Sequence, residues 1–124
     1  MIYLDTHVVI WLAAGDTDQL SRRAAATIGS DDLRISPMVR LELQFLDELN
    51  RLVMKPAEIV AALEKDLGLS VCDARFDAVI HTAMANAWTR DPFDRLITAQ
   101  ALLADAPLVT KDQVIRKHYK KAIW

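Results

Sequence analysis

Short apolar, β-prone runs alternate with longer amphipathic stretches along the whole chain. The runs predict strands at 2–4, 33–36, 69–72 and 106–110, with a fifth, edge strand at 122–124. Between the strands, apolar residues at helical spacing predict helices at about 6–14, 22–28, 38–50, 56–67, 76–88 and 92–103, with one more in the tail. This alternation is typical of a mostly parallel sheet between two layers of helices. We therefore predict an α/β fold and a single domain, residues 1–124.

The first predicted strand is followed at once by the start of a helix. Asp5 and Thr6 come directly after the run at 2–4, and apolar residues at helical spacing follow as far as Gly15. Asp is a preferred helix N-cap, so Asp5 has a sufficient structural role there. It also follows a strand that is apolar on both faces, and ligands of parallel sheets gather where such strands end. The residues alone leave both roles of Asp5 open.

The helix at 38–50 carries an acid on its apolar side. One face of this helix contains Met38, Leu41, Phe45, Leu46 and Leu49. Glu42 falls in the middle of that face, which we expect to pack on the core. A lone buried carboxylate costs several kcal/mol or takes up a proton. Glu42 therefore needs either a core-facing arginine or a bound cation, and the sequence leaves the two open.

Further acids lie at a predicted helix start, Asp91 and Asp94, and directly after a predicted strand, Asp112. Asp91 is placed as an N-cap and Pro92 as the first helical residue, and Asp94 lies in the first turn, where the helix dipole favours negative charge. This structural role does not explain why two acids crowd the start of an otherwise apolar helix. Asp112 follows the fourth predicted strand, as Asp5 follows the first.

Composition and charge exclude some classes of protein for this chain. Hydrophobic residues make up 52% of the 124 residues, which is enough to bury one core. The formal net charge of -2 argues against binding nucleic acid through bulk positive charge, although the tail from Lys111 onward is locally basic. No apolar run reaches the length of a membrane span. We expect a cytoplasmic protein without a membrane partner.

Cysteine and histidine contribute no predicted site. The single cysteine, Cys72, can form neither an internal disulfide nor a cysteine metal site, and its apolar setting favours an inert thiol in a reducing compartment. His7 and His81 each stand without a second histidine or cysteine at ligand spacing. We interpret both histidines as core or surface residues.

Four acids, in contrast, occupy equivalent places in the predicted fold: Asp5, Glu42, Asp94 and Asp112. Parallel winding brings these places to one edge of the sheet, so the carboxylates should converge. Four anions in one crevice repel each other, and their hard oxygens suit Mg²⁺ or Mn²⁺. Such a cation lowers the pKa of a bound water and shields a phosphate oxygen, as phosphodiester hydrolysis requires.

The segments that carry these acids form a set. They are Leu-Asp5-Thr with Trp11 downstream, Ile35-Ser-Pro37 with Glu42 five residues on, Arg-Asp91-Pro-Phe-Asp94-Arg-Leu-Ile97, and Leu-Val-Thr-Lys-Asp112. Taken in order, they resemble the four motifs of PIN-domain nucleases, most closely those of the VapC toxins of bacterial toxin–antitoxin pairs. The resemblance covers essentially the whole chain.

The resemblance implies a fold, an activity and partners. The fold would be a three-layer α/β/α sandwich with a parallel sheet of order 3-2-1-4-5. The activity would be that of a Mg²⁺- or Mn²⁺-dependent endoribonuclease. The protein would be a homodimer that acts on RNA as a toxin and is held inactive by a cognate VapB-type antitoxin.

It also implies roles for single residues. The acidic positions of the family, which bind the metal ion and carry catalysis, are matched by Asp5, Glu42, Asp94 and Asp112. An extra acid seen in a subgroup is matched by Asp91. Small hydroxyl residues that commonly support the site are matched by Thr6, Ser36 and Thr110. The residues that bind the substrate are not identified, with Arg95 and Lys111 as candidates.

Three alternatives stay open at this point. A phosphohydrolase of the haloacid-dehalogenase kind also begins with a strand and an Asp, but it needs a second Asp where this chain has His7. A non-catalytic scaffold or receiver-like domain would be favoured if one of the acids were paired with Arg40, Arg90 or Arg95. A PIN-domain nuclease of RNA processing would act without an antitoxin, and a small antitoxin gene directly upstream would separate it from a toxin. The sequence does not identify the RNA that is cut.

Overall fold

A computed structural model describes all 124 residues of the chain. The strands β1 (Ile2–Leu4), β2 (Leu33–Ile35), β3 (Ser70–Val71), β4 (Leu108–Val109) and β5 (Ala122–Ile123) form one sheet in the order β3-β2-β1-β4-β5. Every neighbouring pair is parallel. The predicted α/β class, the parallel sheet and its strand order are therefore confirmed.

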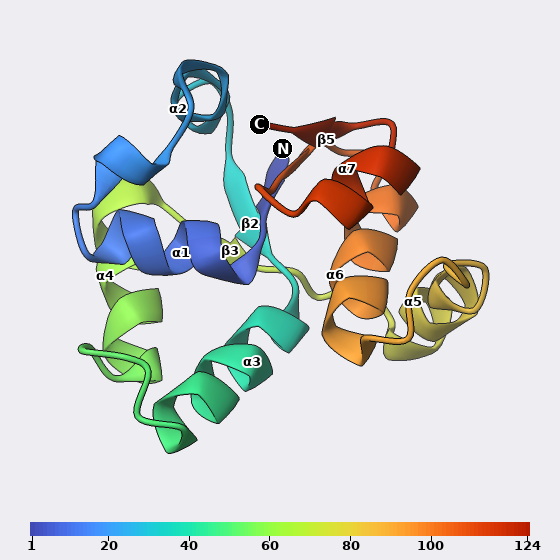
Figure 1. Cartoon of the computed structure of the whole chain (residues 1–124), viewed down its shortest axis with the longest axis horizontal. Helices are drawn as coiled ribbons and strands as arrows, with labels where there is room; N and C mark the ends of the chain where they lie inside the picture. The colour runs from blue at the N-terminus through green and yellow to red at the C-terminus, as the bar shows by residue number, and fades with distance from the viewer.

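Helices lie on both sides of this sheet. They are α1 (Thr6–Ala13), α2 (Arg22–Ile28), α3 (Pro37–Glu48), α4 (Pro56–Leu67), α5 (Phe76–Ala83), α6 (Pro92–Leu103) and α7 (Gln113–His118), with a 3-10 turn at Thr17–Gln19. In Figure 1, α1 and α4 lie to the left of β2, α3 lies below it, and α5, α6 and α7 lie to the right. The arrangement is the predicted three-layer sandwich. No helix has both the length and the apolar character that crossing a membrane requires.

The core is centred on β1 and β4. Their side chains are almost completely buried, with Leu4, Leu108 and Val109 at 0% exposed. Strands covered by helices on both faces must be apolar at every position, which is why these runs show no alternation. The central place of β1 puts its carboxyl end, where Asp5 begins, in the middle of the sheet edge.

The side of α3 that meets the core differs from the prediction. Val39 and Leu43 are fully buried, whereas Leu41, Phe45 and Leu49 are 44%, 48% and 60% exposed. The helical wheel showed an apolar face, but the stripe that faces the sheet depends on how the helix axis is placed in the tertiary structure. The predicted core contact was therefore wrong for these three residues, whereas Met38 of the same face does pack against the core. Its acid, Glu42, is half-buried instead of centred in the core.

Helix α5 is also shorter than predicted, because it ends at Ala83 and not near residue 88. The guanidinium of Arg95 donates hydrogen bonds to the carbonyl oxygens of Ala83, at 3.1 and 3.3 Å, and Met84, at 3.3 Å. These bonds satisfy carbonyls at the end of α5. Phe76, the first residue of α5, is 71% exposed. The side chain that satisfies this helix end comes from α6, so the sequence of α5 itself gives no sign of it.

Candidate active site

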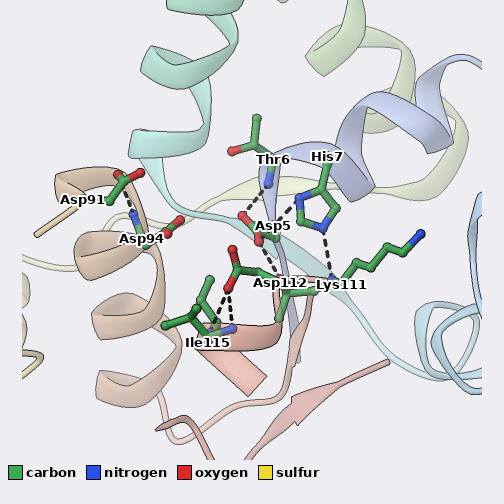
Figure 2. Close-up of polar contacts among 10 residues, drawn as sticks. Asp5, Thr6, His7, Asp91, Asp94, Lys111, Asp112 and Ile115 are labelled. Atoms are coloured by element: carbon green, nitrogen blue, oxygen red, sulfur yellow. Dashed lines mark hydrogen bonds and ion pairs between the residues drawn. The ribbon is translucent and has the colours of Figure 1, made fainter. Parts of the chain in front are cut away.

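Asp5 lies at the carboxyl end of the central strand and is only 4% exposed. One carboxylate oxygen accepts a hydrogen bond from the Thr6 backbone N–H at 2.8 Å, and the other accepts one from the Thr110 hydroxyl at 2.6 Å. The first bond caps α1, as the sequence suggested. The second holds the carboxylate in one orientation, on the side where Figure 2 shows Asp94 and Asp112.

Asp112 reaches the same place from the end of β4. One of its carboxylate oxygens accepts hydrogen bonds from the backbone N–H groups of Val114 and Ile115, both at 2.9 Å. Its other oxygen points toward Asp5 in Figure 2. The Asp112 backbone N–H donates to the Thr110 hydroxyl at 3.0 Å. The fully buried hydroxyl of Thr110 therefore ties the two strand-end acids together.

Helix α6 brings two more acids to this edge. Asp91 is the exposed N-cap, and its carboxylate accepts hydrogen bonds from the N–H groups of Phe93 at 2.8 Å and Asp94 at 3.3 Å. Asp94 is partly buried and points toward the side of Asp5 and Asp112 in Figure 2. Burial is the largest cause that raises the pKa of Asp94 to about 7, and the other contributions come from the charges of Asp91, Asp5, Asp112 and Glu42. Four carboxylates thus act on Asp94 from different elements.

Glu42 comes to the site from the middle of α3. This helix starts at the buried Ser36, whose hydroxyl accepts a hydrogen bond from a backbone N–H of the first turn at 3.1 Å. Burial raises the pKa of Glu42, and the charges of Asp5 and Asp91 raise it further, while the nearby Thr6 hydroxyl opposes the rise. The Thr6 hydroxyl is buried and forms no hydrogen bond. Glu42 is thus the nearby polar group with which this hydroxyl interacts, although the two form no hydrogen bond of ordinary geometry.

His7 belongs to the same neighbourhood, although sequence analysis gave it no role. Its Nε2 accepts a hydrogen bond from the Lys111 backbone N–H at 3.1 Å, and its Nδ1 lies 3.7 Å from a carboxylate oxygen of Asp5. Because Nε2 accepts, the proton of the neutral ring is on Nδ1, on the side of Asp5. A search for histidines at metal-ligand spacing could not find this residue. Its position two residues after Asp5 was the only available signal.

The acids share no basic partner. Apart from the His7 contact with Asp5, no ion pair in the structure involves any of them. In particular, the arginines whose pairing would have favoured a non-catalytic domain pair with none of the acids: Arg40, Arg90 and Arg95. The salt-bridge alternative for Glu42 is therefore not realised.

The donor atoms of this acid cluster suit a divalent cation. The available donors are hard carboxylate oxygens, which Mg²⁺ and Mn²⁺ prefer, and their charge is not neutralised. As the side chains stand, however, no three acids or histidines enclose one common position for an ion. The fit thus rests on donor type and charge, and not on a preformed cage.

The two candidate RNA contacts lie in different settings. The guanidinium of Arg95 is engaged at the end of α5, which gives it a structural role. The Lys111 side chain extends away from the carboxylates in Figure 2, and its ammonium lies 5.9 Å from the Trp11 ring centroid and 6.0 Å from that of Trp124. Of the two, only Lys111 keeps a cation that no carbonyl or carboxylate holds.

Comparison with known proteins places the chain in a family. The PIN domain family matches residues 2–121. Ribonuclease VapC22 of Mycobacterium tuberculosis (strain ATCC 25618 / H37Rv) is 31% identical over 125 residues, which cover 94% of this chain and 91% of that protein.

Two solved structures share the fold. A chain of VapBC2 from Rickettsia felis, bound to a DNA fragment from the promoter, has a TM-score of 0.66 and 19% identity, with 100% of this chain and 98% of that chain covered. A chain of VapBC-1 from nontypeable Haemophilus influenzae has a TM-score of 0.55 and 21% identity, with 98% and 92% covered. At such identities the likeness shows the fold alone. With the family match and the relative at 31% identity, the chain belongs to the PIN domain family as a VapC-type member.

Proposed function

We propose that this chain acts in the cytoplasm, as a single domain, as a Mg²⁺- or Mn²⁺-dependent endoribonuclease and as the toxin of a type II toxin–antitoxin pair. The observation that carries the proposal is the cluster of Asp5, Glu42, Asp94 and Asp112, which lie close together without an arginine or lysine partner. The relative at 31% identity is named a ribonuclease, and the structurally similar chains come from VapBC assemblies.

The geometry supports different roles for the four acids. A divalent cation, when bound, would lower the pKa of a water molecule and shield the phosphate oxygens of the RNA. Asp5 is held in place by Thr110 and by the start of α1, and Asp112 by the start of α7. Burial and the neighbouring carboxylates raise the pKa of Asp94 to about 7 and also raise the pKa of Glu42, so the ionised forms of these two acids gain most from positive charge at the site.

The test is cleavage of total RNA by the purified protein, with Mg²⁺ and with EDTA. We expect EDTA to stop cleavage and Asp5→Asn to lower it by orders of magnitude. Asp66→Asn, which removes an exposed acid of α4, should cleave like wild type and controls for the loss of one negative charge, while Asp5→Asn purified in the same way controls for contaminating nucleases. Circular dichroism would establish that both variants are folded. Cleavage that persists in EDTA or in Asp5→Asn would contradict the proposal.

The toxin role includes a VapB-type antitoxin as partner. A groove of about 640 Å³ between α3 and α4, lined by Leu41, Pro56 and Val60 among others, provides apolar surface for such a partner. Expression of the chain alone should arrest growth. Co-expression with the small protein encoded directly upstream should restore growth and yield a co-purified complex. A chain that cuts RNA but neither arrests growth nor has such a neighbour would be the RNA-processing nuclease instead.

A further inference from the structure

A row of three aromatic rings leads away from the acid site. The ring centroids of His7 and Trp11 are 5.0 Å apart, and those of Trp11 and Trp124 are 5.9 Å apart. The row starts next to Asp5, whose carboxylate lies 3.7 Å from His7. The first two rings come from α1, and the third follows β5 at the same edge of the sheet. All three rings are half-buried, so part of each is open to solvent.

A free ammonium group covers this row. Lys111 Nζ lies 5.9 Å from the Trp11 centroid and 6.0 Å from the Trp124 centroid, within the range of a cation–π contact. It forms no ion pair, although the acid site is close by. The Lys111 backbone N–H binds His7, so the ring row and the lysine are also connected through the main chain. Core packing accounts for the buried parts of the indoles, but it does not account for the ammonium above them.

Beyond Trp124 the surface is hollow and basic. A cavity of about 440 Å³ is lined by Arg23, Gln113, Arg116, Lys117, Ala122 and Trp124. Three of these side chains are cations, none is an acid, and none of the cations is in an ion pair. On a chain with a formal net charge of -2, this is a local concentration of positive charge. It adjoins the row of aromatic rings at Trp124.

We propose that Trp11, Trp124 and Lys111, together with this basic hollow, bind a single-stranded stretch of the RNA next to the phosphodiester that is cut. The proposal rests on the proposed ribonuclease function. Bases of any identity stack on aromatic rings, while neighbouring cations bind the phosphates, and this combination binds single strands. The acid site repels phosphates, so the strand needs positive charge beside it to stay in place. Lys111 leaves the ring face to meet a phosphate when a base takes its place.

The experiment measures binding and not only cleavage. Wild-type protein in EDTA is titrated into a short, fluorescently labelled single-stranded RNA at several salt concentrations. Stacking contributes about 1–3 kcal/mol per base, so Trp124→Ala should weaken binding roughly 5- to 150-fold with no change in the salt dependence. Lys111→Gln should instead reduce the slope of log affinity against log salt by about 0.7, the value for one phosphate contact of a single strand.

Two further variants separate stacking from packing. Trp124→Phe keeps an aromatic face and should retain most of the affinity. Trp88→Phe changes a tryptophan that stacks on His118, outside the row, and should bind like wild type. The RNA subsite is overturned if Trp124→Ala binds RNA like wild type, or if Trp124→Phe loses as much affinity as Trp124→Ala. It is also overturned if Trp124→Ala loses the antitoxin and not the RNA, because the surface then belongs to the protein partner.

The same measurements distinguish this proposal from the function on which it rests. Wild-type protein that neither binds nor cuts RNA would contradict the ribonuclease function itself, and the subsite with it. Wild-type protein that cuts RNA, with Trp124→Ala equal to it in affinity and in cleavage, would contradict the subsite alone. With the subsite in place, Trp124→Ala should raise KM and leave kcat nearly unchanged, because it removes binding outside the reacting atoms.

Discussion

At the scale of single residues, the Thr110 hydroxyl connects two acids that are far apart in sequence. It donates to Asp5 and accepts from the Asp112 backbone N–H. Thr110→Val keeps the shape and removes both bonds, which leaves a buried carboxylate and an N–H without these partners. We expect a loss of about 1–3 kcal/mol in unfolding free energy and a strong loss of cleavage. Urea denaturation and the RNA assay measure the two effects.

Thr110→Ser is the matched control, because it retains the hydroxyl. It should keep most of the activity and of the stability. Equal behaviour of the serine and valine variants in both measurements would show that the hydroxyl does not orient the site.

Glu42 offers a second prediction at this scale. No basic side chain pairs with it, and burial and the charge of Asp5 already disfavour its ionised form. Glu42→Gln should therefore leave the metal-free protein at least as stable as wild type near pH 8, while cleavage falls by orders of magnitude. Denaturation in EDTA tests the first half. A loss of about 3–5 kcal/mol would instead indicate a stranded buried partner charge.

At the scale of an element, two acids at the start of α6 have different roles. The carboxylate of Asp91 caps the helix, whereas that of Asp94 accepts no such bond and has a pKa raised to about 7, first by burial and then by the charges around it. Asp94→Asn should abolish cleavage. Asp91→Asn should keep measurable activity, because Asn also caps helices, and should cost about 1 kcal/mol or less. Equal loss of activity in the two folded variants would show that these roles are wrong.

Helix α3 exposes an apolar stripe of Leu41, Phe45 and Leu49 on the side away from the sheet. Isolated exposed apolar residues are common, but a continuous stripe on one helix marks a contact surface. We predict that the protein is a homodimer and that Leu41→Lys with Leu49→Lys converts it to a folded monomer. Light scattering gives the mass, and a melting curve gives the folding. A double variant that keeps the wild-type mass, or a wild type that is already monomeric, would contradict this prediction.

At the scale of the whole molecule, the crowded acids link stability to pH. The pKa of Asp94 rises from 3.8 to about 7 on folding, mainly through burial, so between these values the folded state holds a proton that the unfolded chain has lost. The unfolding free energy of the metal-free protein should therefore fall as pH rises through this window and level off above it. Asp94→Asn should show a flatter profile in the same EDTA melts. If Asp94→Asn and wild type show identical stability profiles against pH, Asp94 is not the cause of the pH dependence.

Mg²⁺ should reverse this loss. A ligand that binds only the folded state adds roughly 2.7 kcal/mol at about 100 times its Kd, so Mg²⁺ should raise the melting temperature. The rise should be larger at about pH 8 than at about pH 5, because the ligating carboxylates must be free of protons. If neither Mg²⁺ nor Mn²⁺ shifts the melting curve at either pH, the four acids do not form a common metal site.

The sequence by itself was enough for the alternation of strands and helices, for the N-caps Asp5 and Asp91, and for the expectation that the acids lie at one sheet edge. These features depend on neighbours within a few residues, or on the general rule that parallel strands end together. The strand order came from the resemblance to PIN domains. That the acids bind metal and cut RNA stays a prediction.

Only the tertiary structure decided which stripe of α3 is buried, where α5 ends and that His7 lies beside the acid site. It also brought Trp11 and Trp124 together, from opposite ends of the chain. Each of these features depends on groups that are remote in sequence, as in the hydrogen bond between Asp5 and Thr110, which spans 105 positions. The periodicity of apolar residues indicates which residues share a helix or strand face. It does not indicate which other segment packs against that face, because that segment is brought there by the folding of the whole chain.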